Sequence, residues 1–120
     1  MMLDLIEDDD AVRLSTMALF ESYGLKIRSH ASARTFLSVY KTSDCLLVNQ
    51  HMPGLKGLDL IAKLREAGDN TPAILITGCE SALIYRRAAA YAVPVVVKPV
   101  RFDDLIEEIE SVCRAFVPAD

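Results

Sequence analysis

Five short apolar segments alternate with five stretches of helical spacing, and this alternation restricts the possible folds more than any other feature of the chain. Strands that are separated by helices pair in parallel through right-handed crossovers, with helices covering both faces of the sheet. We therefore expect an α/β fold, a three-layer, doubly wound, five-stranded parallel sheet. The predicted strands are 2–6, 25–29, 45–48, 73–77 and 93–97, and the predicted helices are 10–23, 32–40, 58–67, 81–91 and 103–116.

Two local expectations follow from the pattern of the first two strands and the first helix. His30 comes just after an edge strand, so we expect its side chain to be solvated. The first helix carries a stripe at helical spacing that we expect to face the core. Its members are Val12, Thr16, Leu19, Phe20 and Tyr23.

Length and composition indicate one ordinary globular domain, residues 1–120. The net charge is −4 and the basic residues are scattered, which argues against direct nucleic-acid binding by this domain. The first ten residues turn acidic at once, unlike a signal peptide, and no apolar run is long enough to span a membrane. An odd number of cysteines without a C-x-x-C pair fits a reduced compartment. We expect a cytoplasmic location and no membrane association; the cysteines are Cys45, Cys79 and Cys113.

Polar side chains follow four of the five predicted strands, at the point where each strand ends. In open parallel sheets this carboxyl edge is where ligands bind. Carboxylate and amide oxygens suit a hard cation such as Mg²⁺, whereas a hydroxyl and an ammonium suit the oxygens of a phosphoryl group. The residues are Glu7 and Asp8 after the first strand, Asn49 after the third, Thr77 after the fourth and Lys98 after the fifth.

With these motifs in this order, the chain resembles over its full length the receiver domain of two-component response regulators. The matching segments are LIEDDDAVR (5–13), LVNQHMPG (47–54) with Gly57, ILITG (74–78) and VKP (97–99). The resemblance implies a flavodoxin-like sheet with strand order 2-1-3-4-5. It also implies two-component signal transduction, in which a sensor histidine kinase or phosphorelay protein passes a phosphoryl group to an Asp after the third strand.

The resemblance also assigns roles to the polar residues of the site. It implies an Mg²⁺ site with Asp8 as a direct ligand, Glu7 as a helper through water, the residue at position 49, and the backbone carbonyl of His51. The phosphoryl-contacting residues would be Thr77 and Lys98, and Lys98–Pro99 would be a cis-proline step.

Two positions depart from the family pattern. The phospho-acceptor position is Asn49, and a neutral carboxamide oxygen is a very poor nucleophile where a carboxylate is needed. Loss of one negative charge also weakens the expected Mg²⁺ site. At the switch position, where family members often have Tyr or Phe, the chain has Val95, which has no ring to swing.

Several functions remain open at this point. Asn49 is either natural, in a pseudo-receiver that works by binding, or a variant or engineered block of a conventional phosphorylated regulator. A protein partner or a homodimer would use the face formed by the fourth helix, fifth strand and fifth helix. A flavin or other small-molecule domain is disfavoured, since an acidic loop follows the first strand where a phosphate loop would be needed. An enzyme is not expected, because no nucleophile and base pair is evident.

Overall fold

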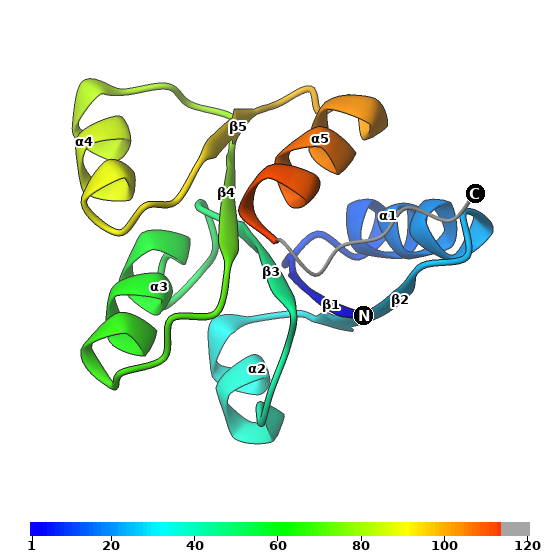
Figure 1. Cartoon of the computed structure of the whole chain (residues 1–120), viewed down its shortest axis with the longest axis horizontal. Coiled ribbons are helices and arrows are strands. Elements are labelled where there is room, and N and C mark those ends of the chain that lie inside the picture. The colour runs from blue at the N-terminus through cyan, green and yellow to red at the C-terminus, as the bar shows by residue number, and fades with distance from the viewer. Residues whose placement is uncertain (114–120) are drawn as a thin grey trace.

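The computed structural model describes residues 1–113 and places a five-stranded parallel sheet between two layers of helices (Figure 1). The strand order is β2-β1-β3-β4-β5, with every pair parallel, which confirms the predicted fold class. The strands are β1 (Met2–Ile6), β2 (Lys26–His30), β3 (Cys45–Asn49), β4 (Ala73–Thr77) and β5 (Val95–Val97).

Two helices cover one face of the sheet and three cover the other (Figure 1). The first face carries α1 (Asp10–Ser22) and α5 (Phe102–Val112). The last helix was predicted to reach residue 116, but Cys113 is already extended, and residues 114–116 lie outside the described residues. The second face carries α2 (Ala33–Val39), α3 (Gly57–Glu66) and α4 (Ala82–Ala90). Three helices begin at side-chain caps, from Asp9, Ser32 and Ser81, as their sequence positions favour.

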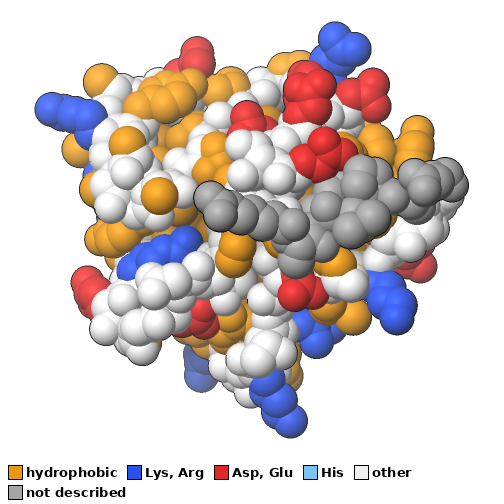
Figure 2. Space-filling view, in the orientation of Figure 1, with side chains coloured by type: hydrophobic (Ala, Val, Ile, Leu, Met, Phe, Trp, Pro, Cys, Tyr) orange, Lys and Arg blue, Asp and Glu red, His pale blue; other side chains and the backbone are white. Residues whose placement is uncertain are grey.

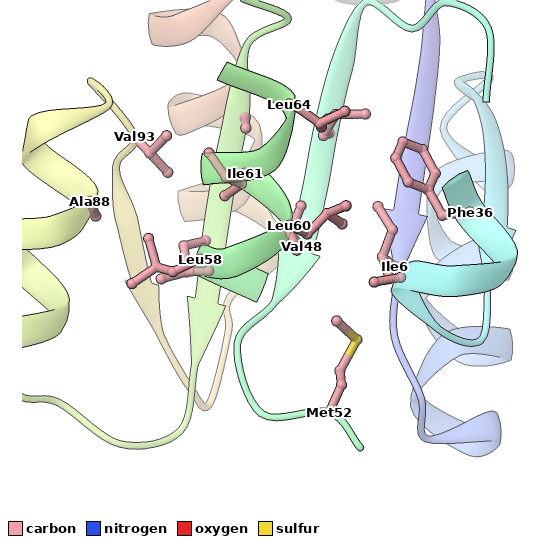
Figure 3. Close-up of a cluster of buried hydrophobic side chains, with 14 residues drawn as sticks. Ile6, Phe36, Val48, Met52, Leu58, Leu60, Ile61, Leu64, Ala88 and Val93 are labelled. Carbon is pink, nitrogen blue, oxygen red and sulfur yellow. The ribbon is translucent and has the colours of Figure 1, made fainter. Parts of the chain in front are cut away.

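The alternation of side chains along each strand divides the core into two clusters. Leu5 and Leu47 point to the α1 and α5 side, whereas Ile6 and Val48 point to the side of α2, α3 and α4. Figure 3 shows the second cluster, in which Met52 from the loop after β3 lies near Ile6 at the carboxyl edge of the sheet. The loop that leads away from Asn49 is thereby anchored in the core.

Four of the five residues predicted for the inner face of α1 do face α5, but most of them are not buried. Only Phe20 is buried, while Leu19 is 41% exposed and Tyr23 is 56% exposed. The reason is that α1 shares its layer with α5 alone, and the two helices touch at Phe20 and Phe102 but leave an open pocket of about 240 Å³ between them. Leu19 lines this pocket, and the Tyr23 ring lies against Phe102 with centroids 4.4 Å apart.

β5 is shorter at its start than predicted and begins at Val95. Pro94 has no N–H to donate to a ladder. Its carbonyl still accepts a hydrogen bond from the backbone of Leu75 at 3.0 Å, so the chain already runs beside β4 before the strand begins.

Asp4 in β1 is buried and pairs with two side chains of the neighbouring strand β2. One of these is His30, so the expectation that His30 is solvated is wrong. Asp4 is 1% exposed and accepts two hydrogen bonds from Arg28, at 3.0 and 2.8 Å. His30 Nε2 lies 2.8 Å from the same carboxylate. Burial alone would raise the pKa of Asp4, but the hydrogen bonds from His30 and Arg28 more than offset burial and lower the pKa to about 2.

Replacing Asp4 with Asn is expected to lower the free energy of unfolding at neutral pH by about 2 kcal/mol, because one pKa unit corresponds to roughly 1.4 kcal/mol. The pKa is lower in the folded state than its ordinary 3.8, so the contribution is complete above that value and is lost as the pH falls toward 2. Urea titrations of both proteins across this range measure the difference.

The matched control for this prediction is Asp59→Asn, which breaks the exposed ion pair with Arg87. It is expected to cost less than about 1 kcal/mol. A loss for Asp4→Asn that is no larger than the control, or that does not shrink on acidification, would contradict the assignment.

Candidate functional site

The strand order brings three chain segments together at the carboxyl edge of the sheet. β3 lies between β1 and β4, with Ile6 opposite Val48 and Asn49 opposite Ile76. Glu7 directly follows β1, and Thr77 ends β4. Residues far apart in the sequence therefore meet around Asn49.

The side chain of Asn49 is buried and its amino group points into the acidic end of the site. Nδ2 lies 3.0 Å from Glu7 Oε2, 3.2 Å from Asp8 Oδ1 and 3.0 Å from the carbonyl oxygen of His51. The opposite orientation would set the amide oxygen against these acceptors, so the hydrogen-bond partners fix the direction of the amide. Its own oxygen, Oδ1, is the only buried side-chain polar atom among residues 1–113 without a hydrogen-bond partner.

The two acids differ in their surroundings. Glu7 is 4% exposed, and its burial raises the pKa, with Asp8 beside it acting in the same direction. The backbone N–H of Asp9 and the ammonium of Lys98 oppose this rise, and Lys98 Nζ lies 3.5 Å from Glu7 Oε1. Asp8 is exposed at the rim. The site therefore holds one buried and one solvated carboxyl group.

Thr77 and His51 meet on the other side of Asn49. The Thr77 hydroxyl donates to the carbonyl of Cys79 and accepts from its N–H, both at 3.1 Å, so it fixes the loop after β4. His51 Nε2 lies 3.2 Å from the same hydroxyl. The sequence predicted a role only for the backbone of His51, and the contact of its ring with Thr77 was not foreseen.

Two residues that were given no role hold the loop after β3 in place. Gln50 is buried, and its side-chain oxygen accepts the backbone N–H of Leu58 at 2.7 Å, while its own carbonyl accepts the N–H of Gly57 at 3.2 Å. A Cβ on Gly57 would lie 2.5 Å from the carbonyl oxygen of Asn49. Gly57 thus permits the start of α3 to pass directly against the residue at the centre of the site.

The oxygen atoms around Asn49 are those that a hard cation prefers, but the arrangement does not fit one as it stands. Glu7, Asp8 and the His51 carbonyl converge on the point that the amino group of Asn49 occupies. Within residues 1–113 no group of three or more His, Cys, Asp or Glu side chains is placed to hold a metal ion. Nitrogen-bound protons and a cation cannot occupy the same position.

A doubly wound parallel sheet in this order, with polar groups gathered at its carboxyl edge, defines a flavodoxin-like α/β domain. The family model for the response regulator receiver domain matches residues 4–110. The chain belongs to the response regulator receiver family.

The chain is 31% identical over 113 residues to the response regulator protein TmoT of Ectopseudomonas mendocina, covering 92% of this chain and 51% of that protein. It is 41% identical over 75 residues to the transcriptional regulatory protein FixJ of Azorhizobium caulinodans, covering 61% of this chain and 36% of that protein. The chain thus spans about half, or less, of the length of these curated relatives.

Solved structures show the same fold. The structure of the response regulator StyR has a TM-score of 0.86 at 26% identity, covering 94% of this chain and 59% of that one. A crystal structure of FixJ-N has a TM-score of 0.85 at 25% identity, covering 98% and 97%. No helix within residues 1–113 has the length and apolar character needed to cross a bilayer.

Replacing Gly57 with Ala is expected to lower the free energy of unfolding by about 1–3 kcal/mol, because the added methyl group meets rigid backbone rather than a movable side chain. The matched control is Gly78→Ala, whose Cβ would meet only the Lys98 side chain at 3.9 Å and should be tolerated. Thermal or urea unfolding measures both. Equal stability of the two variants would contradict the close approach of α3 to Asn49.

Proposed function

We propose that this chain is a receiver module that signals in a two-component pathway by binding a protein partner, without phosphorylation of residue 49. The observation that carries the proposal is the buried carboxamide of Asn49, hydrogen-bonded to Glu7 and Asp8 at the acceptor position. A carboxylate there could attack phosphorus, but a carboxamide oxygen is a very poor nucleophile. An acyl phosphate does not form at this position without prior deamidation.

The proposed partner surface is the face formed by α4, β5 and α5. On α4, Leu83 is 58% exposed and Tyr85 is 42% exposed. Figure 2 shows hydrophobic side chains on the α4 side and acidic ones over α5. The switch position, Val95, is half-buried between them and has no ring that could change the shape of this face. The surface is therefore proposed to be permanently presented to a protein partner or to a second copy of the chain.

A conventional regulator whose phosphorylation is blocked by Asn49 is the second candidate, and the positions of Thr77 and Lys98 favour it. Thr77 ends β4 beside Asn49, and Lys98 lies next to Glu7. These are the groups proposed to contact a phosphoryl group delivered by a sensor histidine kinase or phosphorelay protein. In this reading a single substitution, Asn49→Asp, restores the acceptor and a stronger Mg²⁺ site.

The two candidates are separated by measuring the intact mass after incubation with Mg²⁺ and a small phosphodonor, for this protein and for Asn49→Asp. We expect no gain of a phosphoryl group by this protein, because it has no carboxylate at position 49. Labelling of Asn49→Asp alone would support the blocked regulator, and labelling of neither would support the binding module. Labelling of this protein as it stands would contradict both.

A control variant shows whether any label on Asn49→Asp is formed by the proposed site. Adding Thr77→Ala or Lys98→Ala to Asn49→Asp removes a group proposed to contact the phosphoryl oxygens, and the labelling rate should fall by at least about tenfold. An unchanged rate would show that these residues do not form the phosphoryl side of the site.

A further inference from the structure

The amino group of Asn49 has an unusual set of neighbours. All three of its hydrogen-bond acceptors, at 3.0 to 3.2 Å, are oxygens of the residues that would hold a cation: Glu7, Asp8 and His51. Two of them are carboxylate oxygens, and none comes from a residue outside the acidic site. A positively polarised N–H₂ group thus stands where a positive ion would stand.

The three distances are those of hydrogen bonds to the amino group, and an ion bound directly at the same point would need shorter ones. An N–H···O hydrogen bond spans about 2.9–3.0 Å, whereas Mg²⁺ binds oxygen at about 2.0–2.1 Å. The observed separations of 3.0 to 3.2 Å match the former. For a direct Mg²⁺ ligand set the three oxygens would have to move inward by about 1 Å each.

We propose that the carboxamide of Asn49 takes the place of the divalent cation. Its amino group hydrogen-bonds to the acidic oxygens and competes with Mg²⁺ for them. A cation can enter only when the amino group leaves, by a half-turn of the carboxamide. That turn breaks the contacts of the amino group with its three acceptors and places Oδ1 among the acidic oxygens, where only a bound cation makes it favourable. Asn49 is then mainly a competitor of the ion and not a weak ligand.

The buried oxygen of Asn49 opposes this arrangement, so the contacts of the amino group must outweigh it. Oδ1 has no hydrogen-bond partner in the present arrangement, which is a cost that buried polar atoms rarely bear. The two protons of Nδ2 are shared among three acceptors, two of them carboxylate oxygens, and these contacts outweigh that cost and keep the amide in place. The inference rests on the proposed function, since it explains how the receiver site stays ordered without a metal or a phosphoryl group.

The test compares Mg²⁺ affinity in three forms of the protein: with Asn49, with Asn49→Ala and with Asn49→Asp. Backbone amide shifts near Asp8 and His51, followed by NMR during an MgCl₂ titration, report binding without any phosphoryl transfer. If the amide competes, Asn49→Ala binds Mg²⁺ at least about tenfold more tightly than this protein, although it has one oxygen fewer. Asn49→Asp binds most tightly, because it adds a charged ligand.

The opposite order of the first two forms overturns the proposal. If Asn49 is a weak ligand, its removal in Asn49→Ala lowers Mg²⁺ affinity, and equal affinities would also show that the amide does not compete. Because the readout is metal binding, these outcomes leave the phosphodonor result for the proposed function unaffected.

A second measurement covers the case in which Asn49→Ala does not fold. The melting temperature of this protein should differ by less than about 1 °C between EDTA and about 10 mM Mg²⁺, while that of Asn49→Asp should rise by several degrees. A comparable rise for this protein would contradict the substitution of the cation by the amide.

Discussion

The ends of β1 and β3 lie side by side, and this places two carboxyl groups within hydrogen-bonding distance of one buried carboxamide. Buried or closely spaced carboxylates repel each other and lose hydration, so such a site needs a positive group or a set of donors. In this chain the amino group of Asn49 and the ammonium of Lys98 supply them. The arrangement of the loops around the site depends on this balance between the two carboxyl groups and the two positive or donor groups beside them.

The supports of Asn49 are as important as its hydrogen bonds. Met52 anchors the loop after β3 in the core, and Gln50 fixes the start of α3. Gly57 allows α3 to begin within contact of the Asn49 backbone. The side chain at position 49 therefore has little freedom to move away from the acids, and a change in its chemistry changes the whole site.

The sequence predicts the fold closely where the signal is local. The apolar runs of β3 and β4 end in Asn49 and Thr77, and both strands lie where the sequence places them. Predictions fail where burial depends on the neighbouring elements. The whole inner stripe of α1 was expected to face the core, but only Phe20 is buried, because an open pocket lies between α1 and α5.

For the candidate site, the sequence identifies which residues meet but not how they are oriented. Strand ends that carry Glu7, Asn49 and Thr77 predict convergence. The direction of the Asn49 amide depends on the positions of three separate acceptors, which no local pattern encodes. The same is true of Asp4, whose pairing with Arg28 and His30 depends on the register of β1 against β2.

Whether the amino group of Asn49 is held in the acidic site can be measured directly, because the chain contains only two asparagines, Asn49 and Asn70. Protein labelled with ¹⁵N-asparagine should give two side-chain amide signals, of which Asn70, on an exposed loop, is the internal reference. Hydrogen exchange in EDTA should be much slower for Asn49 than for Asn70, since its protons are buried and bonded to three acceptors. Equal exchange rates for the two side chains would contradict the account.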